Sequence, residues 1–464
     1  MGRQEEREDL TGYDRVPYPG HPFAQTHPDR LATVATMFGL RSADPASCRL
    51  LEIGCGDGGN LVPMAYGLPG ARFTGIDLAG TAIAQAEELA RTLGLENVTL
   101  RQSDLTAIDD LGRFDYVVCH GVYSWVEPHV RDALLAACRA HLAADGVAYV
   151  SYDVFPGGHM REVTRQMLRW HLRDVDDPAE RIAQARALLT AVSEAGQPQA
   201  EWALGQSDPA LFHDELAEHH EAVLFTDFVD HAARHGLHFL AEADVFEMQA
   251  GGLPPGLGDD PIIREQYLDF FKGRMFRQTL LCHAGSERRE PSPELVRGLL
   301  VATPARPVGD IGPGRVEFRG PGGSTLTTDH NGVKAALGRL GEAWPRALPV
   351  AELADDEAVR DALLRAYTAN LVQLHVWAPA LPADVAERPV ASALARVQAA
   401  RGTRVTNLWH ATVEVPDDLG RRLITLLDGT RDRAGLLDEL QRPAGELERS
   451  LEGLRRIALL EAVE

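Results

Sequence analysis

The chain has 464 residues, a length that favours two or three domains over one compact core. Hydrophobic residues make up 45% of it and charged residues 25%, as in globular proteins, and no apolar run approaches the ~20 residues of a membrane span. The 68 acidic and 46 basic residues give a formal net charge of −22, which disfavours nucleic acid as a partner. This charge is compatible with a cationic substrate such as a lysine or amino-terminal group, but by itself it favours a role in solubility.

The N-terminus and the cysteines bear on cellular location. Residues Met1–Asp9 are charged and lack the apolar stretch of a secretory signal, so a cytoplasmic protein is expected. The five cysteines include no C-x-x-C pair, so reduced thiols are expected and no metal site is predicted.

Strands and helices alternate from Arg49 onward, after a helix expected over Asp29–Phe38. This alternation predicts a doubly wound, Rossmann-like parallel sheet with right-handed crossovers. The expected strands are Arg49–Ile53, Arg72–Asp77, Val98–Gln102, Tyr116–Cys119 and Val147–Tyr152, with helices over Gly80–Leu93 and Arg131–Leu142.

Charged helical patterns follow Pro156, over Met160–Ala195 and Pro209–His235, before strand patterns return at His238–Val245 and Phe276–His283. We therefore predict a helical insertion over residues 161–235. The sheet domain is then discontinuous and covers 1–160 and 236–285.

The last third of the chain differs in kind. Polar stretches at Gly285–Pro293 and Pro379–Pro389 predict linkers that separate two modules, 294–378 and 390–464. Leu337–Leu374 and Leu423–Leu460 share a layout of helix, turn, short helix and amphipathic helix. This α+β layout predicts winged-helix-like modules that serve interaction rather than catalysis.

The loop after the first strand is the most informative segment. It contains G-x-G-x-x-G (Gly54, Gly56, Gly59), which indicates a dinucleotide site, and also G-x-G-x-G (Gly54, Gly56, Gly58). Two acids distinguish these possibilities, because Glu52 and Asp57 disfavour an anionic pyrophosphate. S-adenosylmethionine (SAM) carries an amino group and a sulfonium but no phosphate, so the acids favour SAM.

Two further acids end the next strands. Asp77 ends the second strand, where a carboxylate can accept hydrogen bonds from ribose hydroxyls. Asp104 follows the third strand and is predicted to accept from the adenine amine, with a helix N-cap as the alternative role. Ligands in such sheets bind beyond the carboxyl ends of the strands, which is where these acids lie.

The acceptor side is predicted beyond the fourth and fifth strands. Tyr123 and Trp125 are candidates to wall a cationic acceptor pocket, with core packing as the alternative. Asp153 is a candidate to orient an ammonium and His159 to take its proton, with an exposed loop position as the alternative for the histidine. A general base is not required, because the sulfonium is already activated and positioning supplies most of the advantage.

Other histidines are grouped along the predicted helices. We interpret these groups as solvent-facing helix residues rather than metal ligands. They are His213, His219 and His220, and His231, His235 and His238.

Several segments together resemble a known family, the bacterial methyltransferases that carry a methyltransferase regulatory domain, which include rickettsial protein lysine methyltransferases. The similar segments are Tyr13–Pro19, Phe23–Arg30, Leu51–Leu61, His120–Val126, Ser151–Met160, Arg264–Phe270, Phe276–Cys282, Val405–Leu408 and Leu427–Asp432. The resemblance implies a class I fold, a helical middle region, a winged-helix-like C-terminal region, frequent dimers and lysine N-methylation. It also implies that residues 18–30 pack over the cofactor.

One position departs from the family pattern. Where the family has Pro-Gly-Trp-His-Met, this chain has Gly158 between Gly157 and His159. The change removes an aromatic residue beside the expected acceptor pocket and leaves the acceptor open.

The leading hypothesis is a SAM-dependent N-methyltransferase acting on an amine, first of all a protein or peptide lysine. Two alternatives remain open: a small-molecule methyltransferase that uses its C-terminal region for dimerisation, and a non-catalytic SAM-sensing protein. Tyr123, Trp125, Asp153 and His159 are the catalytic candidates. The predicted cofactor contacts are Tyr18, Gln25, Glu52, Gly54, Cys55, Gly56, Gly58, Asn60, Asp77, Leu78, Asp104, Leu105 and His120.

Overall fold

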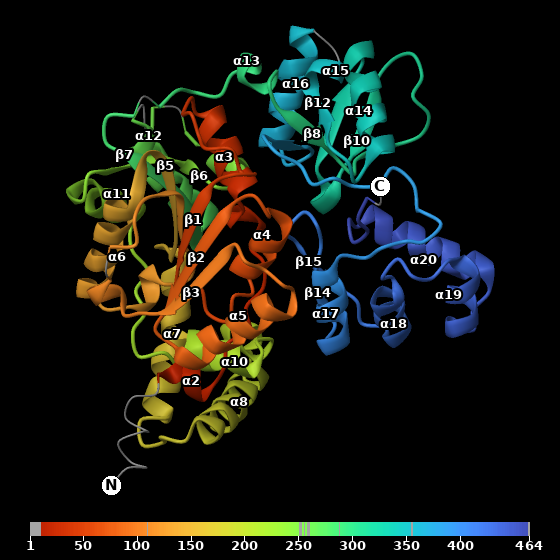
Figure 1. The fold of residues 1–464 in the computed structure, drawn as a ribbon. Coiled ribbons are helices and arrows are strands. Elements are labelled where there is room, and N and C mark those ends of the chain that lie inside the picture. Colours follow the sequence, from red (N-terminus) through yellow and green to blue (C-terminus); the bar gives the residue numbers. More distant parts are fainter. Residues whose placement is uncertain are drawn as a thin grey trace.

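A seven-stranded sheet lies at the centre of the N-terminal half of the computed structural model (Figure 1). The structure describes residues 11–462 apart from 109, 250–252, 255, 258–259, 287 and 354–355, so the charged segment Met1–Asp9 lies outside the described residues. The strands are β1 (Arg49–Ile53), β2 (Arg72–Asp77), β3 (Val98–Gln102), β4 (Phe114–Cys119), β5 (Leu142–Asp153), β6 (Leu237–Glu242) and β7 (Phe276–His283).

The strand order is β3-β2-β1-β4-β5-β7-β6, and β1 to β5 are parallel as predicted. The two returning strands complete the sheet, but β7 runs antiparallel to both β5 and β6. The order reverses between β1 and β4. The loops that follow these two strands therefore open side by side at the carboxyl edge of the sheet, where ligands bind in such folds.

Helices cover both faces of the sheet because its side chains alternate in direction. Leu50, Tyr116 and Tyr149 point into one buried layer, whereas Leu51 and Val117 point into the other. The first layer is covered by α3 (Pro28–Met37), α4 (Leu61–Gly67) and α5 (Gly80–Thr92), and the second by α6 (Pro128–His141) and α11 (Phe225–Arg234).

The helical insertion forms a small core of its own below the sheet in Figure 1, built around Leu168, Leu189 and Leu211. It comprises α7 (Gly157–His171), α8 (Pro178–Glu194), α9 (Pro198–Leu204), α10 (Asp208–Ala210) and the π-helix η4 (Leu211–Glu215). The expected helix Met160–Ala195 is thus two helices, because Pro178 begins a new one at its first position. The expected helix Pro209–His235 is also interrupted, and α11 packs on the sheet rather than on the insertion.

The C-terminal third forms two units that flank the sheet domain on the right of Figure 1. The first holds α13 (Pro293–Val296), β8 (Leu300–Ala302), β9 (Arg306–Pro307), β10 (Val316–Arg319), β11 (Thr325–Thr328), α14 (Asn331–Ala343), β12 (Leu348–Pro349), α15 (Val350–Leu353), α16 (Glu357–Thr368) and β13 (Gln373–His375). The second holds α17 (Ala393–Arg401), β14 (Arg404–Thr406), β15 (Thr412–Glu414), α18 (Asp418–Leu426), α19 (Arg433–Leu440) and α20 (Ala444–Arg456).

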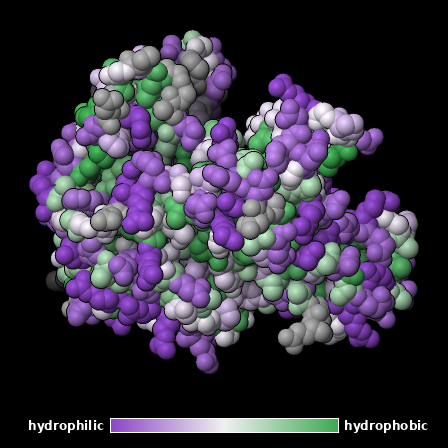
Figure 2. All heavy atoms as spheres, turned by 90° about the horizontal axis from the view of Figure 1, so that it is seen from above, coloured by the Kyte–Doolittle hydropathy of each residue, from purple (hydrophilic) through white to green (hydrophobic). Residues whose placement is uncertain are grey.

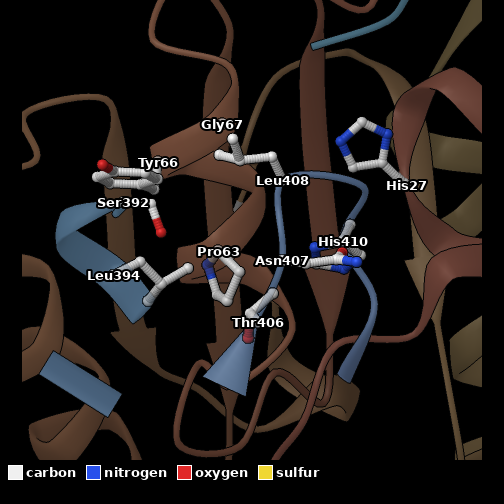
Figure 3. Close-up of a pocket in the computed structure, with 10 residues that line it drawn as sticks. All are labelled: His27, Pro63, Tyr66, Gly67, Ser392, Leu394, Thr406, Asn407, Leu408 and His410. Carbon is white, nitrogen blue, oxygen red and sulfur yellow. The ribbon is translucent and has the colours of Figure 1, made fainter. Parts of the chain in front are cut away.

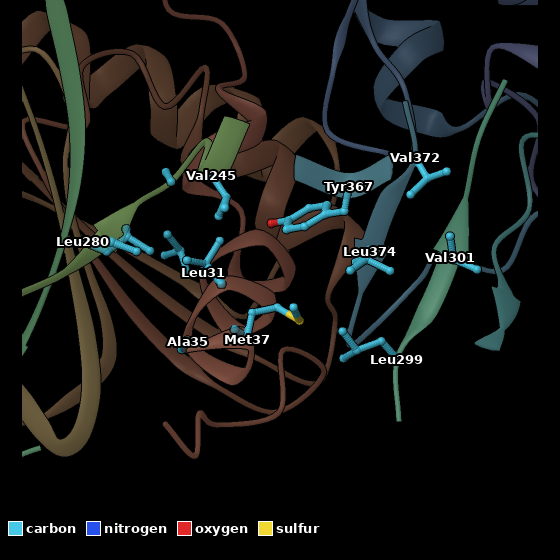
Figure 4. Close-up of a cluster of buried hydrophobic side chains, with 14 of the residues drawn as sticks. Leu31, Ala35, Met37, Val245, Leu280, Leu299, Val301, Tyr367, Val372 and Leu374 are labelled. Atoms are coloured by element: carbon cyan, nitrogen blue, oxygen red, sulfur yellow. The ribbon is translucent and has the colours of Figure 1, made fainter. Parts of the chain in front are cut away.

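The first of these units shares a hydrophobic core with the sheet domain. Leu31 and Met37 of α3 belong to the same buried cluster as Val301 and Leu374 (Figure 4). The second unit has a separate core. The exact domain boundaries stay a prediction. The continuous cluster shows that residues 294–378 pack against the sheet domain and do not form a separate domain with its own core.

Hydrophilic residues dominate the face of the molecule seen from above (Figure 2). Within the described part of the chain, none of the helices combines the length and apolar character that a membrane span requires.

Candidate cofactor and acceptor site

The glycine loop between β1 and α4 turns sharply at the carboxyl edge of the sheet. Gly54, Gly56 and Gly58 have φ values of 78°, 52° and 74°, which favour glycine. A Cβ on Gly58 would lie 2.8 Å from the side chains of Val62 and Ala86, whereas one on Gly56 would meet no atom within 4 Å. The loop therefore packs tightly on one side and leaves open space beside Gly56.

The fourth glycine of the loop, Gly59, packs against the N-terminal segment. A Cβ on Gly59 would lie 2.4 Å from the carbonyl carbon of Gly20, so the two backbones touch. The Gly20 N–H also donates to Asp57 Oδ2 at 3.0 Å. The third glycine of the G-x-G-x-x-G match, Gly59, is thus explained by its close packing against Gly20 and does not require a bound pyrophosphate.

Glu52, at the end of β1, carries a buried carboxylate. Its Oε1 accepts a hydrogen bond from Asn60 Nδ2 at 2.7 Å, while its Oε2 is buried without a partner among the described residues. Burial raises the pKa of Glu52 to about 8. An ammonium group beside Oε2 would satisfy the unpaired oxygen and stabilise the ionised form, so this site fits the amino group of SAM.

Asp77 and Asp104 lie at successive strand ends as predicted. Asp77 Oδ2 accepts from the Gly56 N–H at 2.9 Å and Oδ1 from the Ala79 N–H at 2.8 Å, and burial raises its pKa. Each oxygen keeps a lone pair for a ribose hydroxyl. Asp104 is exposed and caps a short helix by accepting from Thr106, which is the alternative role that its position allowed. Its adenine role stays a prediction.

The N-terminal segment covers this edge of the sheet. Its Phe23 N–H donates to Asn60 Oδ1 at 2.9 Å, and the Phe23 ring stacks on His120 with 3.7 Å between centroids. His120 Nδ1 lies 2.9 Å from the Tyr149 hydroxyl, and burial lowers the pKa of His120 to about 3. His120 is therefore a neutral, packed ring at the end of β4.

The remaining predicted cofactor contacts are spread around the same edge. Cys55 is buried in the glycine loop, Leu78 is exposed after β2, and Leu105 is half-buried. Gln25 lies in a short helix of the N-terminal segment and donates to Asp244 at 3.4 Å. Their contacts with a cofactor stay predictions.

On the acceptor side, Asp153 ends β5 and is buried. Its Oδ2 lies 2.7 Å from His220 Nε2 and 3.5 Å from Arg161 Nη1. The Trp125 ring lies 4.6 Å from the His220 ring. His159 is exposed in the first turn of α7, so the structure brings His220, and not His159, to this carboxylate.

The Arg161 side chain lies beside Asp153. Its guanidinium lies 4.6 Å from the Trp202 ring and 5.5 Å from the Trp125 ring. Its Nη2 pairs with Glu215 Oε1 at 2.7 Å, and its Nη1 faces Asp153. Two aromatic faces and two buried carboxylates thus surround Arg161, and a second guanidinium, that of Arg165, lies 5.2 Å from the Trp125 ring. This arrangement stabilises positive charge.

The π-helix η4, which carries Glu215, contributes a third acid to this cluster, Asp214. Burial raises the pKa of Asp214 to about 6, against the opposing effect of Arg161. Burial and then Asp214 raise the pKa of Tyr18 to about 12, and the Tyr18 ring meets His213 edge-on at 5.7 Å. Tyr18 therefore lies beside η4, and its contact with a cofactor stays a prediction.

Tyr123 is buried in the core behind the site. Its ring packs edge-on against Phe228 at 5.1 Å, and its hydroxyl lies 2.9 Å from His231 Nδ1. Asp132 lies 3.3 Å from His231 Nε2 and 2.9 Å from His235 Nε2. These hydrogen bonds link Tyr123, His231, Asp132 and His235, and a pocket role for Tyr123 stays a prediction.

Gly158 lies where neighbouring atoms leave little room. A Cβ there would lie 3.0 Å from both Ala222 Cβ and Met275 O, and 3.1 Å from Asp153 Cβ. A tryptophan at this position would have to displace these neighbours. The departure from the family pattern is therefore matched by close packing around position 158.

Three family models match the chain. They are a methyltransferase domain over residues 51–148, a "predicted methyltransferase regulatory domain" over 207–283, and a "PKMT, C-terminal winged helix domain" over 387–455. The first covers the glycine loop and the strands that carry Glu52 and Asp77.

Two curated relatives are uncharacterized proteins of Rickettsia prowazekii. One is 38% identical over 293 residues, 59% of this chain and 53% of its own length, so the chain spans about half of that relative. The other is 30% identical over 234 residues, 48% of this chain and 94% of its own length. The chain belongs to the class I SAM-dependent methyltransferases.

Among solved structures, PKMT2 from Rickettsia typhi is 25% identical to this methyltransferase. The match covers 96% of this chain and 100% of the other, with a TM-score of 0.83. The same protein in complex with AdoHcy matches with a TM-score of 0.85 at 24% identity. The Rossmann-like sheet with a winged-helix C-terminus is therefore the fold of this methyltransferase.

Sequence reasoning missed the insertion residues that lie around Asp153. His220, Arg161 and Asp214 come from a region with no recognisable spacing, and we interpreted their surroundings as charged helices. Only the apolar residues among those charges, such as Leu168 and Leu211, signalled that the region folds on itself and turns some of its charges inward.

Proposed function

We propose that this methyltransferase transfers the methyl group of SAM to an amine, and that the amine is a lysine side chain of a protein or peptide. The observation that carries the proposal is the environment of Arg161. Two buried carboxylates, Asp153 and Glu215, and two indole rings hold the Arg161 cation next to the end of β5, and Arg165 stacks on one of the same rings, Trp125. A lysine side chain carries the same charge on a similar aliphatic stem.

The site suits an amine acceptor chemically. When bound, SAM supplies a methyl group already activated by its sulfonium. The chain has to orient the acceptor nitrogen and exclude water, and a side-chain base can take the proton of an incoming ammonium. Asp214 supports the last task, because burial brings its pKa to about 6 and so makes it a stronger base than an ordinary aspartate.

A polypeptide acceptor is supported by the whole-chain match. The likeness to PKMT2 extends over the helical insertion and both C-terminal units, not over the sheet domain alone. The resemblance in the sequence implies lysine N-methylation for the best-known members. The C-terminal units would then provide surface for the acceptor polypeptide or for a second copy of the chain.

The first experiment is calorimetric titration of the full chain with SAM, S-adenosylhomocysteine and NADH. We expect micromolar binding of both adenosyl compounds and none of NADH; NADH binding alone would overturn the proposed cofactor.

A labelled-methyl screen of lysine peptides, proteins and metabolites then tests the acceptor. We expect labelled lysine. Labelling of a metabolite alone would replace the lysine proposal with the small-molecule activity, and binding of SAM without any turnover would favour the SAM-sensing alternative.

A further inference from the structure

One histidine of the C-terminal winged-helix unit reaches the cofactor loop. His410 lies between β14 and β15, is buried, and has a φ of 55°, a conformation that non-glycine residues rarely adopt. Figure 3 shows it at the interface with α4, beside Asn407 and Leu408. Its Nε2 lies 2.8 Å from Asn60 Oδ1, across 350 residues of sequence.

Asn60 joins three separate parts of the chain. Its Oδ1 accepts from His410 Nε2 and from the Phe23 N–H at 2.9 Å. Its Nδ2 donates to Glu52 Oε1 at 2.7 Å and to Thr26 Oγ1 at 2.9 Å. The side chain therefore connects the C-terminal unit, the N-terminal segment and the acid of the cofactor loop.

These partners fix which way the amide of Asn60 points. An asparagine amide can turn over and exchange its donor and acceptor ends, so its orientation follows from its neighbours. An imidazole that donates from Nε2 requires the oxygen on its side and so places the NH₂ group against Glu52. Burial lowers the pKa of His410 well below its ordinary value, which keeps the ring neutral.

We propose that His410 is a positioning residue for the cofactor: by holding Asn60, it orients the Glu52 carboxylate toward the amino group of SAM. The inference rests on the proposed function only through the cofactor and is independent of the acceptor. It follows that the C-terminal unit has to be docked for tight SAM binding. A polypeptide that moves this unit would change the SAM affinity, and SAM would change the affinity for that polypeptide by the same factor.

The test compares three variants of the full chain. His410→Leu removes the donor, His410→Gln keeps an N–H donor, and Tyr66→Phe is the matched control. Tyr66 lies in the same interface, where its hydroxyl donates to Glu461 at 2.6 Å and accepts from the Ala393 N–H at 2.9 Å, and neither hydrogen bond involves Asn60. Thermal unfolding of each variant monitors loss of docking.

We expect His410→Leu to weaken SAM binding about tenfold, the equivalent of about 1.4 kcal/mol. His410→Gln should recover most of the affinity, and Tyr66→Phe should change it less than twofold at a similar loss of Tm. Loss of the Asn60 hydrogen bond should also move the pH at which SAM binding strengthens to a higher value. The groups that interact with Glu52 are Asn60, Asp77, Asp57, Cys55 and Cys119. Among them, Asn60 is the one whose hydrogen bond to His410 the variant removes.

Three results would overturn the inference: normal SAM affinity in His410→Leu, equal weakening in Tyr66→Phe, or no recovery in His410→Gln. Failure of the wild-type chain to bind SAM would instead overturn the proposed function.

Discussion

Glu52 shows at the residue scale how a binding site costs stability. Its pKa in the folded chain is about 8, against 4.5 for an ordinary glutamate. As the pH rises between these values the unfolded chain loses its proton first, so the folded chain binds more protons and its stability falls. Each pKa unit corresponds to about 1.4 kcal/mol.

A Glu52→Gln variant should not lose folding stability in this way as the pH rises. Without SAM, we expect its Tm to exceed that of the wild type by several degrees at pH 8.5 and to match it near pH 5. Its SAM affinity should fall, because the carboxylate proposed to face the amino group is gone. Calorimetric scans at both pH values check the first effect, and identical Tm differences at the two pH values would contradict the raised pKa.

Asp77 provides the residue-scale check of the ribose assignment. Asp77→Ala should abolish measurable SAM binding, because it removes the ribose acceptor and also frees the Gly56 and Ala79 N–H groups. Asp77→Asn keeps one acceptor oxygen and should bind weakly. Circular dichroism checks that both variants fold, and unchanged SAM affinity in Asp77→Ala would remove the ribose role.

At the scale of elements, two of the segments that resemble the family form a buried ion network rather than a reaction centre. Arg277 of β7 is buried and pairs with Glu242 of β6 at 2.6 Å. It also pairs with Glu265 and Asp269 of α12 (Pro261–Lys272) at 3.0 and 2.9 Å. These contacts join the antiparallel end of the sheet to the helix that covers it.

Arg277→Leu should therefore destabilise the fold by about 3–5 kcal/mol, because it leaves buried carboxylates without a counter-charge. Urea unfolding measures this change in free energy. Arg274→Leu is a milder comparison, since Arg274 shares Asp269 but lies at the edge of the network. A loss below about 1 kcal/mol for Arg277→Leu would show that the network relaxes or hydrates.

At the scale of the whole molecule, both C-terminal units pack against the sheet domain through buried hydrogen bonds. Asp29 of α3 accepts hydrogen bonds from the backbone N–H groups of Val376 and Trp377 at 2.9 and 2.8 Å. Its other oxygen lies 2.7 Å from His375 Nδ1. Together with the shared hydrophobic cluster, these contacts indicate that residues 11–290 are not a self-sufficient unit.

Truncation after Glu290 should therefore expose the apolar side of α3 and remove His410 from Asn60. We expect the truncated chain to unfold without cooperativity and to lose SAM binding, as measured by calorimetry and limited proteolysis. A truncated chain that unfolds cooperatively and methylates a free metabolite would instead support the small-molecule alternative, in which the C-terminal region serves only dimerisation.

The sequence alone determined the alternating strands and helices, the glycine loop and the acids that follow the first strands. These features are local: a strand pattern repeats every two residues, a sharp turn needs glycine, and an acid next to a strand end lies at the edge of the sheet. Only the tertiary structure decided that His220 and Arg161 meet Asp153, that Phe23 stacks on His120, and that His410 holds Asn60. The reason is that such contacts depend on which faces of distant segments pack together, and the spacing of residues along the chain does not predict this packing.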